Sequence, residues 1–387
     1  MKIAKGVNRL GSEAVYNIFA KTKKLAKQGK EIIDLSLGQS DFKSPPHAVD
    51  AAIKALKDGH HGYTLPNGII ECREAVSRKI KTLYRASIDP ERIIIMPGGK
   101  PTMHYAISFF GEPGAEIIYP DPGFPIYESM INFTGAKAVS YDMTENKDFS
   151  INPDKILSLI NEQTRLLIIN NPHNPTGGFT EKSVIDRLAN GLKNFPNLAI
   201  LSDEVYDRLI FDSKEIPTLL NYPDLYDRLI ILNGWSKTYA MTGWRLGWSV
   251  WPEKLIEHVF KFCVNSHSCV NTPAQFGAIA ALEGPENHLQ NMMKEFSIRR
   301  KLIVDGLKSL KGIECSLPGG TFFVFPNVLN TGMTGEEFTE KCLKEAGIAV
   351  IPGTAFGKYA INNVRFNFAT SKENISKAIE KLDKILK

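Results

Sequence analysis

The stretch RLLIINNPHNPTGG, residues 165–178, decides the fold class of this 387-residue chain. Its first part, Arg165–Asn170, is almost wholly apolar, as in a strand that is buried on both faces. The Pro and Gly residues of Asn171–Gly178 then form a rigid, irregular loop, and a helical pattern covers Thr180–Leu192. Similar apolar runs occupy Arg92–Met96, Glu116–Tyr119, Leu198–Asp203 and Leu229–Asn233. This alternation of strands and helices predicts an α/β fold with a large, doubly wound, mostly parallel sheet.

The C-terminal third has a different pattern. A long helix is expected over about Glu286–Leu310, followed by a strand at Thr321–Phe325. A short strand near Ala349–Ile351, a further strand at Val364–Phe368 and a final helix complete it. These elements predict a smaller α+β domain. The boundary near residues 275–290 is expected to be helical, because no low-complexity linker occurs there.

Composition is that of a globular protein, with 43% hydrophobic and 23% charged residues. The net charge of +5 is mild, and no dense basic block with interleaved aromatic residues occurs, so nucleic acid is not an expected partner. A membrane is not expected either, because no apolar run reaches the ~18 residues of a spanning helix. The first residues lack a basic segment followed by an apolar run, and a cytoplasmic location is therefore expected. The five scattered cysteines predict reduced thiols rather than disulfides or a metal site.

The segment NGWSKTYAMTGWRLGW (Asn233–Trp248) carries the most chemistry. It follows an apolar strand and places Lys237 beside small and hydroxyl residues. A lysine that forms a Schiff base needs a closed environment that keeps its amine partly deprotonated. A phosphate nearby needs an arginine fork and hydroxyl donors, which Arg245 and Ser236 can supply. Taken alone, the segment also fits a surface lysine and a structural arginine.

Polar side chains follow the other predicted strands. Asn174, in the loop after Arg165–Asn170, can donate a side-chain N–H to a ligand oxygen at the carboxyl edge of the sheet. Asp203 ends the next strand, where a buried carboxylate can pair with a pyridinium N–H, and Tyr206 can donate to the oxygen that Asn174 contacts. Each segment alone also fits a plain turn or a helix N-cap. Either Asn-Pro bond of the loop can be cis, which the sequence does not decide.

A third segment, MPGGKPTMHYAI (Met96–Ile107), reads as a strand, a Gly pair and a helix start. Backbone N–H groups at a helix N-terminus favour an anion such as a phosphate, so Gly99 and Lys100 are candidates to bind one. Pro101 suits the first helical turn, although it removes one donor. The segment does not match a Walker sequence.

In this order and spacing the segments resemble those of the class I/II aminotransferases of fold-type I, which use pyridoxal 5′-phosphate (PLP). The similarity is greatest to the aspartate-aminotransferase-like subgroup, and it extends from SLGQSDFKSP (Ser36–Pro45) to the C-terminal segment Val364–Leu382. It implies a large PLP-binding domain over residues 45–280. It also implies a small domain built from residues 1–44 and 281–387.

The resemblance implies a role for each matching residue. Lys237 matches the Schiff-base lysine, and Asp203 matches the partner of the ring nitrogen. The remaining matches are the donors to the ring oxygen, Asn174 and Tyr206; the phosphate cup, Arg245, Ser236, Gly99 and Lys100; the aromatic residue on the ring face, Phe124; the groups for the substrate α-carboxylate, Arg365 and Gly38; and a tyrosine that reaches the phosphate of the neighbouring subunit, Tyr63. A homodimer with active sites at the subunit interface follows from the last match.

The implied reaction moves an amino group from an L-amino acid to a 2-oxo acid such as 2-oxoglutarate by a ping-pong mechanism. Lys100 matches a lysine that meets the distal carboxylate of aspartate or glutamate, whereas Glu13 and Val15 replace small hydroxyl residues of the subgroup. Glu13 either repels a second carboxylate or neutralises Lys100. The segment Asn265–Pro273 lacks the arginine that some relatives place there. Aspartate-like donors are thus only slightly favoured over aromatic, aliphatic or sulfur-containing ones.

Two other functions share this fold. One is a PLP-dependent C–S β-lyase, which releases pyruvate and ammonia from an S-substituted cysteine without an oxo-acid acceptor. The other is the effector-sensing half of a transcription regulator, which needs a DNA-binding domain before it. The aminotransferase-like pattern begins within the first few dozen residues, which disfavours the regulator.

Overall fold

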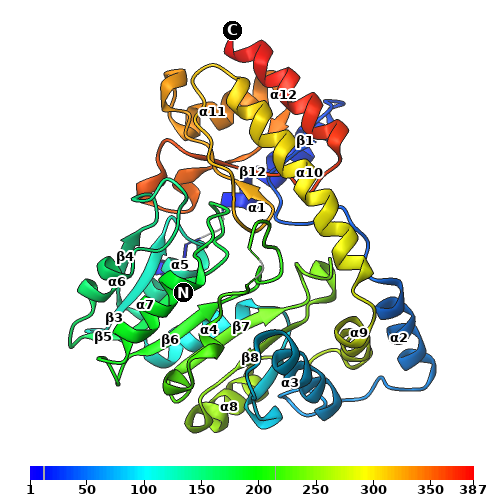
Figure 1. Ribbon diagram of the computed structural model, residues 1–387, viewed down its shortest axis with the longest axis vertical. Helices are drawn as coiled ribbons and strands as arrows, with labels where there is room; N and C mark the ends of the chain where they lie inside the picture. The colour runs from blue at the N-terminus through cyan, green and yellow to red at the C-terminus, as the bar shows by residue number, and fades with distance from the viewer. Residues whose placement is uncertain (12–13, 214) are drawn as a thin grey trace.

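The computed structural model describes residues 1–11, 14–213 and 215–387. Within those residues, the largest sheet has seven strands in the order β2-β8-β7-β6-β5-β3-β4 (Figure 1). In that order their bounds are Ile93–Met96, Gly247–Val250, Leu229–Gly234, Ala199–Asp203, Thr164–Asn170, Glu116–Asp121 and Lys137–Asp142. The strands from β7 to β4 are parallel, and β8 runs antiparallel to both β2 and β7. The predicted mostly parallel sheet is therefore confirmed, and all five predicted strands belong to it.

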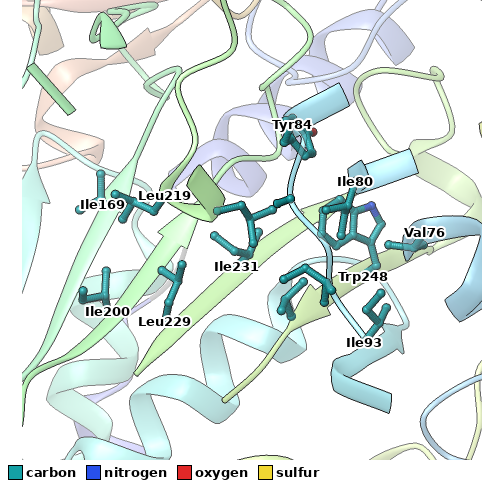
Figure 2. Packing of buried hydrophobic residues seen from close by; sticks show 14 of the residues in the cluster. Val76, Ile80, Tyr84, Ile93, Ile169, Ile200, Leu219, Leu229, Ile231 and Trp248 are labelled. Carbon is teal, nitrogen blue, oxygen red and sulfur yellow. The ribbon is translucent and has the colours of Figure 1, made fainter. Parts of the chain in front are cut away.

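Helices cover both faces of this sheet because successive strand residues point to opposite sides. Ile93 and Ile95 of β2 join one buried cluster with residues of α2, α3, α6, α7 and α9, whereas Ile94 and Met96 join another with residues of α4, α5 and α8. Figure 2 shows part of the first cluster, in which Ile80 of α3 lies near Trp248 of β8. The bounds of the helices are Pro46–Lys57 (α2), Ile70–Tyr84 (α3), Lys100–Phe110 (α4), Ile126–Thr134 (α5), Pro153–Leu159 (α6), Lys182–Leu192 (α7), Ile256–Ser266 (α8) and Thr272–Glu283 (α9).

A further buried cluster lies between α10 (Asn287–Ser309) and α12 (Lys372–Leu386), which pack together at one end of the molecule (Figure 1). A small antiparallel sheet in the order β11-β12-β9 and a parallel pair, β1 with β10, lie in this part of the molecule. All of these strands except β11 supply residues to the cluster. The bounds of these elements and of the two remaining helices are Ala14–Lys27 (α1), Ile33–Asp34 (β1), Phe323–Val324 (β9), Gly335–Lys341 (α11), Ile348–Ala349 (β10), Ile351–Pro352 (β11) and Val364–Asn367 (β12). The separate buried clusters agree with a smaller second domain, while its exact boundaries stay a prediction.

Two expectations need correction in detail. The region near residues 275–290 is not one helix, because α9 ends at Glu283 and α10 begins at Asn287. Gly284 and Pro285 stand between them, and proline cannot supply the N–H that a continuous helix requires. The strand expected over Thr321–Phe325 is reduced to Phe323–Val324, because only these residues pair with β12.

The parallel direction of β5, β6 and β7 brings their carboxyl ends to one edge of the sheet, as ligand-binding folds of this type require. Asn170 ends β5, Asp203 ends β6, and Lys237 follows β7 by three residues. No helix in the described part of the chain has the length and apolar character to cross a membrane.

Candidate active site

A cavity of about 290 Å³ lies at this edge of the sheet. It brings together every residue predicted for the site except Tyr63. The predicted residues that line it are Gly38, Gly99, Lys100, Phe124, Asn174, Asp203, Tyr206, Ser236, Lys237, Arg245 and Arg365. These residues come from distant parts of the sequence, so the fold, rather than any one motif, assembles the cavity.

Lys237 lies at the centre of this arrangement. Its Nζ donates to the carbonyl oxygen of Gly38 at 2.6 Å and lies 5.8 Å from the ring centre of Tyr206. Burial lowers the pKa of the Lys237 amine to about 8, and the positive charges of Arg365 and Arg245 act in the same direction. The amine is therefore partly neutral near physiological pH, which a nucleophilic lysine needs.

Asp203 lines the cavity but is almost wholly buried, and burial raises the pKa of its carboxyl to about 6. Two donors oppose that rise. The hydroxyl of Tyr127 donates to Oδ2 at 2.5 Å, and the backbone N–H of Val205 donates to Oδ1 at 3.2 Å. The carboxyl is consequently held by one donor on each oxygen while it still faces the cavity.

Arg365 and Asn174 form a hydrogen-bonded pair across the cavity. Arg365 Nη1 donates to Asn174 Oδ1 at 3.0 Å, and Nη2 donates to the carbonyl oxygen of Ser36 at 2.7 Å. The guanidinium also lies over the ring of Phe323, 4.3 Å from its centre. Because Asn174 Oδ1 accepts from Arg365, its amide N–H₂ is the part that can meet a ligand oxygen.

A Gly pair and Arg245 form the remaining wall. Gly98 has φ +89°, and a Cβ there would lie 2.2 Å from Nη2 of Arg245, so only glycine lets the guanidinium approach the backbone. Helix α4 begins next to it at Lys100, and its first turn has no side-chain cap. The positive end of the helix dipole and the nearby cations favour an anion at this point.

Among the residues at this site that were missed in the sequence, two contact predicted site residues through hydrogen bonds, namely Tyr127 and Asn170. Tyr127 lies three residues after Phe124, at the start of α5, and its ring meets that of Phe124 edge to face with centres 6.0 Å apart. Asn170 accepts the backbone N–H of Asn174 at 2.9 Å and donates to the carbonyl oxygen of Asp203 at 2.9 Å. The Asn doublet at the end of a predicted strand was a signal for Asn170, whereas no sequence signal linked Tyr127 to Asp203.

Tyr63 is the predicted site residue that the cavity of its own chain does not include among the described lining residues. Its side chain is 93% exposed. The loop that carries it is nevertheless anchored, because Thr272 donates to the carbonyl oxygen of Gly62 at 2.9 Å and the ring of His60 lies 4.5 Å from that of Phe276.

The residues around the cavity fit PLP in kind. An amine with a lowered pKa suits its aldehyde, and a buried carboxyl suits its ring nitrogen. The glycine-lined wall with Arg245 suits its phosphate. A Cβ on Gly38 would lie 3.9 Å from Lys237 Nζ and 3.3 Å from the Phe323 ring, so glycine also keeps the space beside the amine open.

Comparison with known proteins agrees with this geometry. The family described as aminotransferase class I and II matches residues 30–382. An aspartate aminotransferase of Pyrococcus horikoshii is 36% identical over 99% of this chain and 97% of its own length. An aromatic-amino-acid aminotransferase of Thermococcus litoralis is 34% identical over 94% of each chain. A crystal structure of the aspartate aminotransferase from Rhizobium meliloti superposes with a TM-score of 0.95 at 28% identity, over 100% of this chain and 99% of the other. The chain therefore belongs to the class I and II aminotransferases, which are PLP-dependent enzymes of fold-type I.

Proposed function

We propose that this aminotransferase binds its PLP on Lys237 and takes aspartate-like amino donors, with a 2-oxo acid such as 2-oxoglutarate as the acceptor. One observation carries the assignment of the lysine. The amine of Lys237 has its pKa lowered to about 8, and it shares a single cavity with the Asp203 carboxyl and the Arg365 guanidinium. A nucleophile, an acid partner and a carboxylate-binding fork are the groups that amino transfer requires.

Each residue then has a distinct task. When bound, PLP supplies an electron-withdrawing ring that makes the Cα proton of the substrate acidic. Lys237 would take that proton from Cα and deliver it to the C4′ carbon of the cofactor, while Asp203 would keep the ring nitrogen protonated. The remaining residues bind different groups: Asn174 and Tyr206 the ring oxygen, Phe124 the ring face, Ser236, Gly99, Lys100 and Arg245 the phosphate, and Arg365 and Gly38 the substrate α-carboxylate.

The preference for an aspartate-like donor rests on two cations in one cavity. Arg365 and Lys100 both line it, and Lys100 Nζ lies 5.6 Å from the ring centre of Phe124. Two cations suit a substrate with two carboxylates. Glu13, the residue that argues against this donor class, lies outside the described residues. Relatives named for aspartate and for aromatic amino acids keep aromatic donors as the main alternative, beside aliphatic and sulfur-containing ones.

A panel of amino donors with 2-oxoglutarate tests the donor class. Aspartate should give the highest kcat/KM, and Lys100→Met should lower kcat/KM for aspartate more than for phenylalanine, because only aspartate loses an ion pair. An equal loss for both donors would assign Lys100 to the phosphate alone. A higher kcat/KM for phenylalanine in the unaltered enzyme would refute the aspartate assignment.

The lysine assignment has its own test. Lys237→Ala should abolish both turnover and the absorbance band of covalently bound cofactor. Lys100→Ala is the control, since it removes a lysine from the same cavity without removing the covalent bond. If Lys237→Ala keeps spectrum and turnover, the assignment is wrong.

We further propose a cytoplasmic homodimer in which Tyr63 completes the site of the partner subunit. Support comes from its 93% exposed side chain on an anchored loop. Lys237→Ala and Tyr63→Phe chains, each of low activity alone, should recover activity when they are unfolded and refolded together, because half of the mixed dimers' sites then carry both residues. Activity equal to the sum of the separate proteins would contradict a shared site.

A further inference from the structure

Tyr127 makes a buried contact with Asp203 that the assigned roles leave unexplained. Its side chain is 0% exposed, and its hydroxyl donates to Oδ2 of Asp203 at 2.5 Å. Tyr127 is not among the described residues that line the cavity, whereas Asp203 is. The tyrosine therefore contacts the carboxyl from outside the cavity.

The start of α5 fixes this position. The backbone N–H of Tyr127 donates to the carbonyl oxygen of Phe124 at 3.0 Å, so one turn of chain sets both side chains. Phe124 lies on the cavity wall, and Tyr127 is packed among the apolar residues between the sheet, α4 and α5. A buried hydroxyl needs a partner, and the carboxyl of Asp203 supplies it.

We propose that Tyr127 is a positioning residue that holds the Asp203 carboxylate ionised and in the plane needed to pair with the cofactor's ring nitrogen. With Val205 N–H on Oδ1 and Tyr127 on Oδ2, the carboxylate has one fixed donor on each oxygen and cannot rotate without losing one. Donors to a carboxylate stabilise its charged form against burial. The proposal rests on the function assigned above to Asp203.

Non-covalent cofactor binding isolates this effect. Pyridoxamine 5′-phosphate has no aldehyde and binds without a bond to Lys237. An analogue in which C–H replaces the ring nitrogen has the same shape but cannot pair with Asp203. The ratio of the two dissociation constants, measured on the apoenzyme at one pH, reports the ring-nitrogen contact alone, because general damage to the site weakens both ligands.

The unaltered protein should prefer the nitrogen-containing ligand, and Tyr127→Phe should shrink that preference roughly tenfold or more, as expected for losing a hydrogen bond to a charged group. Tyr141→Phe is the matched control. Tyr141 is also buried, but its hydroxyl donates to a main-chain oxygen, that of Ile168, at 3.1 Å. That variant should keep the full preference.

Two outcomes overturn the proposal and differ from each other. If the unaltered protein and Asp203→Asn bind both ligands with the same ratio, the role of Asp203 fails, and the role of Tyr127 fails with it. If Asp203→Asn abolishes the preference while Tyr127→Phe retains it in full, the role of Asp203 stands and Tyr127 is a packing residue. The thermal unfolding of both Phe variants is compared first, so that a loss of stability is distinguished from a change in ligand preference.

Discussion

The lowered pKa of Lys237 predicts how fast the apoenzyme captures PLP at each pH. Only the neutral amine attacks an aldehyde, and at pH 7.5 a pKa of about 8 leaves about a quarter of the lysines neutral, against about one in a thousand for an ordinary lysine. The depressed pKa thus raises the reactive fraction about 200-fold. The rate constant for covalent capture should fall tenfold per pH unit below 8 and level off above it. Stopped-flow absorbance of apoenzyme mixed with PLP measures this profile.

Substitutions of charged residues near Lys237 should move the midpoint of this pH–rate profile in opposite directions. Arg365→Leu removes a positive charge that disfavours protonated Lys237, so its midpoint should rise, although burial keeps it below that of a free lysine. Asp203→Asn removes a negative charge that favours protonation, so its midpoint should fall. Arg228→Leu is the control, because Arg228 binds main-chain carbonyls and is not among the causes of the shift.

Titration of PLP itself contributes equally to every variant, and the comparison between variants removes it. The reasoning is refuted if the profile of the unaltered protein has its midpoint near the ordinary lysine pKa. It is also refuted if Arg365→Leu and Asp203→Asn shift the midpoint in the same direction.

Two further substitutions test the glycine-lined wall of the site and the buried cluster between α10 and α12. Gly98→Ala places a Cβ against the Arg245 guanidinium and should weaken PLP binding roughly tenfold or more. Gly114→Ala is the control, because Gly114 has a similar φ of +94° and a Cβ there would have nothing within 4 Å, so this variant should show only the cost of backbone strain. Equal PLP affinities of the two variants would contradict the contact between Gly98 and Arg245. Phe296→Ala removes a fully buried ring that meets three other phenylalanine rings. The free energy of unfolding, measured by denaturant titration of the apoenzyme, should fall by about 3–5 kcal/mol. A loss below about 1 kcal/mol would mean that neighbouring side chains fill the space left by the ring.

The fold could be predicted from the sequence because strands buried on both faces leave a clear signal. Runs such as Arg165–Asn170 are too short and too apolar for most helices, and Thr164–Asn170 is indeed a strand. The antiparallel direction of β8 had no such signal, since the side-chain pattern of a strand does not depend on its direction. It is set instead by the connection between Gly234 and Gly247, which are paired across β7 and β8.

The site was predictable where the chemistry is unusual and not where it is ordinary. Lys237 lies among small and hydroxyl residues after a strand, and Asp203 ends a buried strand. These patterns indicate a ligand site, and both residues line the cavity. Tyr127 looks like an ordinary core residue in the sequence. Its importance depends on a hydrogen bond to Asp203, which lies 76 positions away in the chain. Tyr63 depends on a second chain, so its role remains a prediction.

The pairing of Gly234 with Gly247 makes residues 235–246 a closed loop tied to the sheet at both ends. This one loop carries Lys237 and Arg245, and hence, in the proposed function, the covalent and the ionic attachment of the same small molecule. Once the phosphate is bound, the aldehyde is presented to the amine at a high effective concentration, because the two anchors are joined by a short tether with fixed ends. Lengthening that loop by even a few residues, with both anchors intact, should lower this effective concentration and slow cofactor capture.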